Sequence, residues 1–338
     1  MKPSVVFENS IKESVQDSFL NITASPYEEY DSFLGQVEML LNESKLPQEF
    51  LIALEKVAAE RKTNPYSVHL LRNCPLDPVI PHLGHDDPQS DKHRLKDTFV
   101  AEAMLATVSM VWGNPIMSYA QRFQGDYFTD VYAISKYMGK QTGYSDGELV
   151  YHNDRTAHSV RADYINLLGM RCPSEEYTCT AFVSAEALRQ GLSVHEIEIL
   201  SSEWFETPFD VVSKENNRTL KHSDRHSIFR CDGSIRYLDS HTKPIKEAPF
   251  EVRDAFDALR DSLSRSQKVR HRLLEGDLFT FPNQGGLHSR EIIEIIDTQR
   301  SRKRWLLKTY SLSDAQRAEA TRKYWAEGRP LCMMDSSN

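Results

Sequence analysis

The sequence predicts a mainly β fold, a sandwich or a jelly-roll barrel, with helical additions. From about residue 115 onward, short runs rich in β-branched and aromatic residues alternate with turn-forming residues. Few long helical stretches separate these runs, which argues against a doubly wound parallel sheet, because parallel strands need long crossovers. The β-rich runs span residues 127–134, 148–152, 162–170, 177–184, 227–231, 277–282 and 304–310.

The composition is that of an ordinary globular protein. The chain has 338 residues, of which 40% are hydrophobic and 27% charged, and its formal net charge is −8. This acidic balance argues against a sequence-independent nucleic-acid binder, which needs a basic surface. No run approaches the roughly 18 apolar residues of a membrane span, and residues 1–19 lack the apolar region of a secretory signal.

The five cysteines indicate a reducing compartment. They are odd in number and widely spaced, at Cys74, Cys172, Cys179, Cys231 and Cys332. This spacing fits buried thiols better than a disulfide framework or a Cys-x-x-Cys zinc site. We therefore expect a cytoplasmic protein.

The N-terminal third is expected to be mostly helical. Apolar residues recur at three- and four-residue spacing over 26–62, with an interruption near Pro47, and again over about 95–111. Between these stretches, residues 73–93 contain four prolines and predict an ordered but irregular connection. Within the β-rich part, helices are expected at 184–191 and 249–275.

A candidate metal site begins at the end of the run 148–152. If this run is extended, His152 and Asp154 point to the same face and offer one imidazole nitrogen and one carboxylate oxygen. A metal ion would still need a distant ligand, and a chance surface pair is the alternative interpretation. The other histidines in polar or proline-rich stretches are expected to be solvated: His82, His85, His93, His222, His226 and His241.

A second segment, 275–290, favours the metal interpretation. Gly276-Asp277 predicts a turn, a β-rich run follows, and a His-x-Arg triplet begins at His288 after a glycine-containing bend. Fourteen residues beyond His288, at Arg302, an arginine-bearing run begins.

The order of these motifs resembles the clavaminate synthase-like family of iron(II)/2-oxoglutarate oxygenases. His-x-Asp/Glu, then Gly-Asp-Leu-x-x-x-x-Asn leading to His-x-Arg, then Arg-Trp-Leu follow one another at family spacing over roughly residues 73–312. Residues 152–164, which end in Arg-Ala-Asp-Tyr, are especially close to the family segment. The branch resembled hydroxylates free amino acids such as arginine, lysine and asparagine. The resemblance implies a double-stranded β-helix, a cupin-like jelly roll.

The resemblance also implies that His152, Asp154 and His288 hold Fe(2+). Three ligands on one face of an octahedral iron(II) leave three positions open. Two can take oxygens of the co-substrate 2-oxoglutarate and the third O₂, whereas a closed four-ligand zinc site has no such room. Related halogenases replace the carboxylate with a small residue, so Asp154 favours hydroxylation.

The distal carboxylate of 2-oxoglutarate needs a cation, and a guanidinium binds it through two parallel charge-assisted bonds. Alternation would place Arg300, Arg302 and Arg304 on one strand face, so periodicity does not choose among them. The family arginine directly precedes Trp-Leu, which favours Arg304, whereas the count from the distal histidine favours Arg302. We prefer Arg304, because a two-residue insertion in 291–301 explains the count. Thr180 matches a family threonine that supports the same carboxylate.

Three further residues match substrate contacts of the family. Lys308, four residues after Arg304, corresponds to the basic residue against the α-carboxylate, and Gln121 to a glutamine that holds the α-amino acid group. Asp239 lies where arginine hydroxylases present acids to the cationic tail, but the second position is His241. One carboxylate suits an ammonium better than a guanidinium. The sequence therefore favours L-lysine, hydroxylated at C3 or C4, over L-arginine, L-ornithine, L-asparagine or a carrier-bound amino acid.

We expect a single catalytic domain with a small-molecule amino acid as its partner, without nucleic acid or membrane, and with homo-oligomerisation left open. Two other classes remain: a metal-dependent hydrolase that uses the same ligands to activate water, and a cupin-like protein that binds a ligand without turnover. The arginines after His288 favour the oxygenase, since a hydrolase needs no 2-oxoglutarate anchor. The expected regions are a helical layer (1–112), a jelly-roll core (113–312) with a lid (213–245) and a helical insert (249–275), and a C-terminal tail (313–338).

Overall fold

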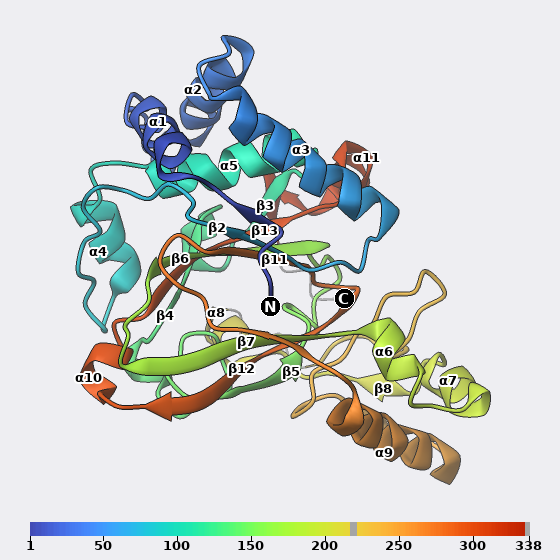
Figure 1. The fold of residues 1–338 in the computed structure, drawn as a ribbon. Helices are drawn as coiled ribbons and strands as arrows, with labels where there is room; N and C mark the ends of the chain where they lie inside the picture. Colours follow the sequence, from blue (N-terminus) through green and yellow to red (C-terminus); the bar gives the residue numbers. More distant parts are fainter. Residues whose placement is uncertain (217–221, 335–338) are drawn as a thin grey trace.

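Two facing β-sheets form the centre of the computed structural model, which describes residues 1–216 and 222–334 (Figure 1). The larger sheet has the strand order β1-β2-β11-β6-β13-β3-β15-β14, with β4 also paired to β13. The smaller sheet has the order β10-β7-β12-β5. Neighbouring strands are mostly distant in sequence, and the arrangement confirms the predicted mainly β fold with helical additions.

Most of the predicted β-rich runs form strands, namely β4, β5, β6, β7, β11 and β13. The run 227–231 is the exception, because it makes only an isolated bridge between Phe229 and Ile235. The strands of the larger sheet are β1 (Val5–Val6), β2 (His69–Arg72), β3 (Ile116–Tyr119), β4 (Thr129–Tyr132), β6 (Tyr164–Arg171), β11 (Leu278–Pro282), β13 (Trp305–Ser311), β14 (Trp325–Ala326) and β15 (Arg329–Met333). The others are β5 (Leu149–His152), β7 (Glu176–Ser184), β10 (Val269–His271) and β12 (Gly286–Ile295), with β8 (Phe205–Glu206) and β9 (Lys243–Pro244) as a separate pair.

Side chains of the larger sheet alternate between two buried environments. In β13, Trp305 and Leu307 pack with the N-terminal helices, whereas Leu306 and Tyr310 pack between the sheets. All seven residues of β13 are buried, and the strand begins with the apolar run Trp305–Leu307 that is typical of a strand covered on both faces. Because successive residues face opposite sides, Lys308 shares the inward face with Leu306 and Tyr310.

Four helices, α1, α2, α3 and α5, pack on the outer face of the larger sheet (Figure 1). Three of them confirm the helices expected at 26–62 and 95–111, including the break near Pro47. The helix within the proline-rich connection was not expected; Pro88 occupies its first turn, and the Asp87 carboxylate caps it by accepting the Ser90 N–H at 3.1 Å. The four covering helices are α1 (Asn9–Phe19), α2 (Tyr30–Asn42), α3 (Gln48–Thr63) and α5 (Val100–Trp112), and the helix of the connection is α4 (Pro88–Leu95).

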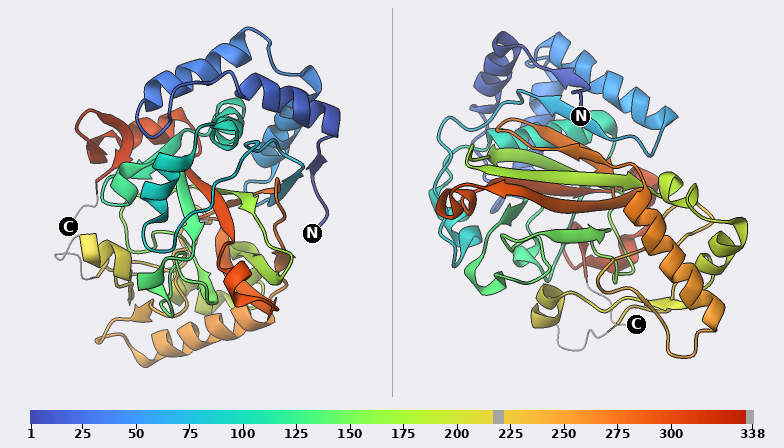
Figure 2. Two further views of the ribbon diagram at one scale, coloured as in Figure 1. Left: turned by 90° about the vertical axis from the view of Figure 1, so that its left-hand side faces the viewer. Right: turned by 60° about the horizontal axis from the view of Figure 1, so that its bottom comes forward.

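A second helical group lies on the opposite side of the molecule, below the smaller sheet (Figure 2). Its longest member ends at Arg265, so the helix expected over 249–275 is ten residues too long: residues 269–271 pair with β7 as strand β10 instead. The group comprises α6 (Ala185–Arg189), α7 (Val194–Leu200) and α9 (Phe250–Arg265), and the remaining short helices are α8 (Val211–Asn216), α10 (Thr298–Ser301) and α11 (Ala315–Ala320).

Two predicted regions differ from the structure. The segment after residue 312 is not a tail over its described part, because β15 pairs in parallel with β3 of the larger sheet. Within the expected lid 213–245, the side chains of Phe229, Ile235 and Tyr237 are fully buried and anchor that part to the core. Residues 217–221 and 335–338 lie outside the described residues, and the closing role of the lid stays a prediction.

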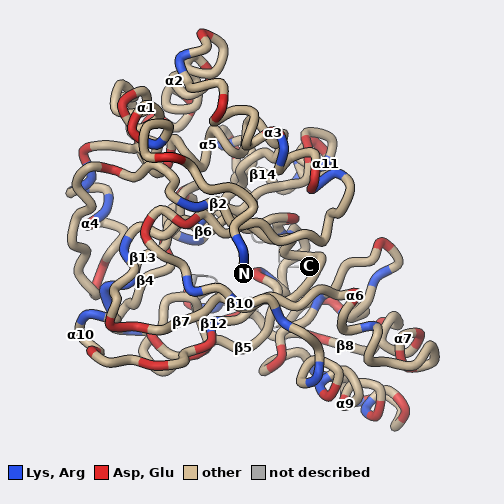
Figure 3. Tube along the Cα trace, viewed as in Figure 1, with Lys and Arg blue, Asp and Glu red and all other residues tan. Residues whose placement is uncertain are grey.

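Charged residues of both signs are interspersed along the chain (Figure 3), in line with the modest net charge. In the described ranges, no helix combines the length and apolar character that a bilayer crossing requires.

Candidate metal centre and active site

The predicted metal ligands meet between the two sheets. His152 ends β5, Asp154 follows in the next turn, and His288 lies in β12, where it is paired directly with His152. The two imidazole rings have centroids 4.2 Å apart. One donor atom from each of the three residues lies within 4.8 Å of the others. Cross-strand pairing of β5 and β12 therefore brings together ligands that are 134 to 136 positions apart in the chain.

The two oxygens of the Asp154 carboxylate have different partners. Oδ1 lies 3.2 Å from His152 Nε2 and 3.6 Å from His288 Nε2. Oδ2 accepts hydrogen bonds from Lys308 Nζ at 3.0 Å and from the Tyr310 hydroxyl at 2.9 Å. Lys308 Nζ also donates to the Tyr310 hydroxyl at 2.8 Å. One oxygen thus faces the histidines, while the other is held from β13.

This donor set fits a divalent metal ion. Ligands about 2.1 Å from one ion at right angles lie about 3 Å apart, close to the 3.2 and 3.6 Å separations of Asp154 Oδ1 from the histidine nitrogens. His152 Nδ1 lies 2.7 Å from the Val150 carbonyl, which can only accept, so Nδ1 carries the proton and Nε2 keeps its lone pair. Two histidines and one carboxylate are the facial set typical of non-heme iron(II).

The protonation states also suit metal binding. Burial and the neighbouring His152 lower the pKa of His288 to about 4, so that its imidazole is neutral at pH 7. Burial by itself raises the pKa of Asp154, but the Lys308 ammonium and the two histidines outweigh it and hold that pKa well below its usual range. Asp154 is therefore an ionised carboxylate, which is the form that coordinates metal.

Two asparagines connect the turn after β5 to the loop before β12. The Asn283 side chain accepts the Asp154 N–H at 2.7 Å and donates to the carbonyls of Asp154 and Ala162. The Asn153 amide donates to the Gly286 carbonyl at 2.8 Å. Asn283 closes the Gly-Asp-Leu-x-x-x-x-Asn motif, so the sequence contained the signal, although it did not reveal this positioning role.

A cavity of about 80 Å³ adjoins the metal cluster. Its charged lining residues are Arg122, Asp154, Arg155, Asp210 and Lys308. The volume is below the roughly 300–1,000 Å³ of typical ligand pockets.

The cavity contains residues that sequence reasoning missed. The Arg122 guanidinium forms an ion pair with Asp210, and its Nη2 donates to the Ser213 hydroxyl at 3.2 Å. Burial alone would raise the pKa of Asp210, but Arg122 and Arg155 lower it below the usual range. Arg122 directly follows the predicted Gln121, whereas Asp210 carried no sequence signal, because only the fold brings it beside Arg122.

Two of the predicted 2-oxoglutarate residues, Thr180 and Arg304, are buried. Thr180 is buried in β7, directly opposite Arg290 of β12. Arg304 precedes β13, and its Nε lies 2.8 Å from Glu176 Oε1. Arg290 donates to three backbone carbonyls of the loop 142–147, and burial and the neighbouring Arg304 lower its pKa to about 10.

The expected alternation of three arginines on one strand is wrong. Arg300 lies in the short helix α10 and Arg302 follows that helix, because Asp297 caps residues 299 and 300 and ends the extended chain. Arg302 Nε lies 3.9 Å from Asp146 Oδ2. Only Arg304 directly adjoins β13.

Of the three predicted substrate residues, only Lys308 lines the cavity, whereas Gln121 and Asp239 do not. Lys308 lines the cavity, bound to Asp154 as described above. Gln121 lines a neighbouring pocket of about 500 Å³. Asp239 lies outside the cavity. Its neighbour Leu238 forms a β-bridge with His152 and lines the cavity, so the side chain of Asp239 points away from it. The Asp239 carboxylate accepts a hydrogen bond from the Tyr237 hydroxyl at 2.6 Å.

At least one of the histidines that were expected to be solvated is buried in the structure. His226 is buried and lies 3.0 Å from the Thr207 hydroxyl, and burial lowers its pKa to about 3. Three of the five cysteines, Cys74, Cys179 and Cys332, are buried, and all five are free thiols.

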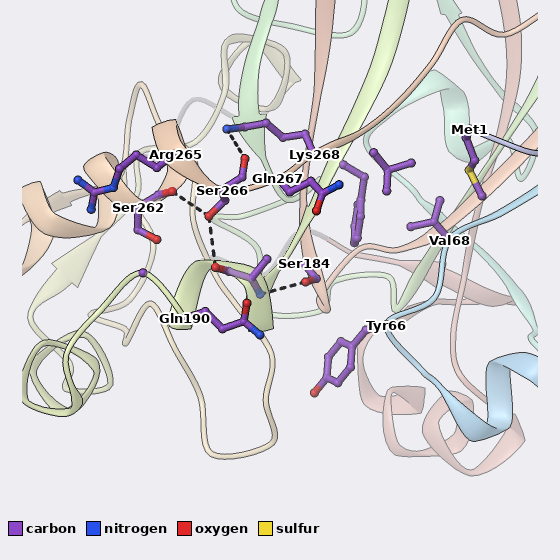
Figure 4. A pocket seen from close by; sticks show the side chains of 14 residues that line it. Met1, Tyr66, Val68, Ser184, Gln190, Ser262, Arg265, Ser266, Gln267 and Lys268 are labelled. Carbon is purple, nitrogen blue, oxygen red and sulfur yellow. Dashed lines mark hydrogen bonds between the residues drawn. The ribbon is translucent and has the colours of Figure 1, made fainter.

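A more open pocket of about 640 Å³ lies between β7, α6 and the end of α9 (Figure 4). Several of its polar groups make local bonds: the Ser266 hydroxyl donates to the carbonyls of Ser262 and Ala187, and Lys268 Nζ donates to the Ser266 carbonyl. Among the described residues that line it, no group of histidines and carboxylates could hold a metal. The smaller cavity beside the metal cluster is the better candidate site.

Comparison with known proteins supports the same assignment of fold. No family model matches the chain. The chain is 24% identical over 271 residues to an L-asparagine oxygenase of Streptomyces coelicolor, covering 78% of this chain and 76% of that protein.

Solved structures match over nearly the whole chain. Asparagine oxygenase in complex with Fe(II), 2S,3S-3-hydroxyasparagine and succinate has a TM-score of 0.79 at 18% identity, covering 98% of this chain and 99% of that one. The non-heme iron oxygenase OrfP in complex with Fe and alpha-ketoglutaric acid has a TM-score of 0.76 at 18% identity, covering 99% and 100%. The fold that the resemblance to the clavaminate synthase-like oxygenases implies is therefore confirmed, and the chain has the fold of asparagine oxygenase and OrfP.

Proposed function

We propose that this protein is an iron(II)- and 2-oxoglutarate-dependent oxygenase that hydroxylates an unactivated C–H bond of a free amino acid. The observation that carries the proposal is the buried cluster of His152, Asp154 and His288, whose donor atoms lie within 4.8 Å of one another beside a charged cavity. The overall reaction would convert 2-oxoglutarate, O₂ and the amino acid to succinate, CO₂ and the hydroxylated amino acid.

In this proposal His152, Asp154 and His288 hold the iron. When bound, iron and 2-oxoglutarate supply the oxidising chemistry, and the protein supplies ligation, positioning and exclusion of water. Lys308 and Tyr310 keep Asp154 Oδ2 occupied, which leaves Oδ1 as the oxygen for the metal. The carboxylate at Asp154 occupies the position that a halide would need, which favours hydroxylation over halogenation.

Arg304 is the proposed partner of the distal carboxylate of 2-oxoglutarate, with Thr180 as a hydroxyl donor. Two facts support it over Arg302: Arg304 is buried at the start of β13, and its partner Glu176 lies on β7, the strand that also carries Thr180. The pair with Glu176 occupies Nε, so 2-oxoglutarate would use the terminal nitrogens of the guanidinium.

Lysine is the substrate that the sequence favours, through one acidic residue for its ammonium. The Asp239 carboxylate accepts the Tyr237 hydroxyl, and Leu238 is the cavity neighbour of His152. Asparagine and arginine derivatives are bound by the structural relatives. Lysine therefore enters the substrate screen as one prediction beside ornithine, arginine and asparagine.

The test is a screen of free amino acids for succinate release with iron(II), 2-oxoglutarate and O₂, with mass spectrometry of the product. We expect one group of amino acids to stimulate succinate release and to gain one oxygen atom. His288→Ala should abolish both signals, whereas His195→Ala, which changes an exposed histidine of α7, should leave them intact. A metal-dependent hydrolase would instead bind iron without any O₂-dependent loss of CO₂, and a binding protein would show no turnover.

A further inference from the structure

The arginine that follows the metal-ligand aspartate has an unusual environment. Arg155 has a φ of 62°, in the left-handed region that non-glycine residues rarely adopt. Its side chain lines the cavity and is only 6% exposed. The guanidinium carbon lies 4.0 Å from the centroid of the Tyr119 ring, and Nη1 donates to the Ser213 hydroxyl at 3.2 Å.

The remaining edge of the Arg155 guanidinium has no partner. Nε and Nη2 are both buried and make no hydrogen bond with any described residue. The stacked Tyr119 ring satisfies the face of the guanidinium but not the N–H groups at its edge. A buried donor left unpaired is costly, and the Nε–Nη2 edge is one of the two that bind a carboxylate through parallel bonds.

The charges that line the cavity point to an anionic ligand. Among the described residues that line it, three cations, Arg122, Arg155 and Lys308, face two carboxylates, Asp154 and Asp210. Asp154 pairs with Lys308, and Asp210 pairs with Arg122. Arg155 forms no ion pair with any described residue of this set, although it lies near enough to Asp210 to help lower the pKa of that carboxyl. Iron(II) and 2-oxoglutarate carry opposite double charges, and the α-ammonium and α-carboxylate of an amino acid cancel, so one further negative charge would balance Arg155.

We propose that the substrate is an amino acid with an acidic side chain, of the aspartate or glutamate type, and that the Nε–Nη2 edge of Arg155 binds its side-chain carboxylate. This proposal rests on the function proposed above and names its substrate class. A lysine or arginine tail would instead add a second uncompensated positive charge beside Arg155. Its only carboxylate partner among the described cavity residues outside the metal cluster would be Asp210, which Arg122 already occupies.

The experiment is isothermal titration calorimetry on the anaerobic protein loaded with iron(II) and 2-oxoglutarate. The ligands are aspartate, glutamate, asparagine, glutamine and lysine. We expect one of the two acids to bind at least about 10-fold more tightly than its amide, and lysine to bind most weakly. Arg155→Gln should weaken binding of that acid by about 30-fold or more, while affinity for the matching amide changes little.

Two further variants control for structural effects. Arg155→Lys keeps the charge but not the two-pronged edge, so it should give intermediate affinity, and it replaces Arg155→Gln if the latter does not fold. Arg189→Gln removes an arginine that stacks on Phe229 at 4.5 Å outside the cavity, and it should leave all affinities unchanged. Melting temperature and 2-oxoglutarate affinity of each variant show whether the fold and the metal site are intact.

Several results would overturn the proposal. If the acid and its amide lose affinity equally in Arg155→Gln, Arg155 binds the α-carboxylate and not the side chain. If lysine is the tightest ligand, or if none of the amino acids binds, the proposed acidic substrate class is wrong, whereas the proposed oxygenase function is not contradicted. A wild-type protein that binds neither iron nor 2-oxoglutarate would refute the proposed function itself, before any amino acid is added.

Discussion

At the scale of single residues, the two oxygens of the Asp154 carboxylate have different roles. Its Oδ1 faces the two histidines, and its Oδ2 accepts from Lys308 and Tyr310. Partners that hold the non-ligating oxygen of a carboxylate orient it and commonly affect metal affinity by 10- to 100-fold. Lys308 therefore has two candidate roles: holding Asp154, as its contacts indicate, or binding the substrate α-carboxylate, as the family pattern implies.

Substitution of Lys308 by Met distinguishes these roles. If Lys308 holds Asp154, Lys308→Met should weaken iron binding by about 10- to 100-fold, measured by anaerobic titration with Fe(II). Lys323→Met is the matched control, because Lys323 also stacks on a tyrosine, Tyr324, but far along the chain from the cluster. Unchanged iron affinity with weaker amino acid binding would support the substrate role instead.

A second residue-scale prediction concerns the anchor of 2-oxoglutarate. Arg304→Ala should weaken 2-oxoglutarate binding by about 3–5 kcal/mol, the usual cost of breaking a buried charge pair. Arg302→Ala should have a much smaller effect, because Arg302 lies 3.9 Å from Asp146 and its side chain is 19% exposed. Affinity measured by calorimetry with the metal present compares the two.

The buried partner of Arg304 requires its own control. Arg304→Ala leaves the Glu176 carboxylate buried without its cation, so the double variant Arg304→Ala with Glu176→Gln separates lost binding from lost stability. If Arg302→Ala has the larger effect on 2-oxoglutarate affinity, the 14-residue spacing from His288 identifies the anchor correctly, and the anchor is Arg302.

At the scale of elements, the site depends on how β5 and β12 are connected to the loop between β11 and β12. Asn283 is fully buried in that loop and bonds both the N–H and the carbonyl of Asp154. The strands supply the histidines, but Asn283 sets the turn that brings Asp154 beside them.

Removal of this connection should disturb both stability and metal binding. Asn283→Ala leaves several buried polar groups unpaired, each worth about 1–3 kcal/mol, so we expect a loss of about 2–3 kcal/mol in urea unfolding. Iron affinity should fall as well, because the Asp154 turn loses its orientation. Asn21→Ala, at a surface asparagine that bonds only local carbonyls, is the control. A loss of stability at unchanged iron affinity would limit Asn283 to a structural role.

At the scale of the whole molecule, polar residues that the fold buries must be neutral or paired. His226 is an example: it is buried near Arg236, and its pKa is lowered to about 3 by burial and by that arginine. The folded protein therefore keeps His226 neutral, while the unfolded chain binds a proton near its ordinary pKa of about 6.5.

This difference predicts a pH dependence of stability. Below pH 6.5 the unfolded state binds more protons than the folded state, so the free energy of unfolding falls as pH falls toward about 3. Each such group contributes at most about 1.4 kcal/mol per pH unit. Urea unfolding of His226→Gln between pH 6.5 and 4.5 should show a shallower slope than the wild type, and His195→Gln should not. Parallel curves for His226→Gln and the wild type would show that another group causes the acid sensitivity.

The sequence by itself determined the β-rich core, most of its strands, the main N-terminal helices and the metal-ligand candidates. These follow from local signals: apolar periodicity, turn residues and the spacing of His152, Asp154 and His288 within ordered motifs. Side-chain alternation along an extended segment was enough to predict that the side chains of His152 and Asp154 point to the same face. The resemblance then implied His288 as the third ligand, and the structure brings it beside His152 through the pairing of β5 and β12.

Only the tertiary structure decided which side chains enter the cavity. Leu238 and not Asp239 lines it, because one bridge to His152 sets the register of a segment without a regular strand, and a shift by one residue reverses the facing of every side chain. Arg155 and Asp210 become cavity residues through contacts with Ser213 and Arg122, which are 58 and 88 positions away. Local sequence patterns specify strands and turns, whereas the partners across them depend on long-range pairing that no local pattern contains.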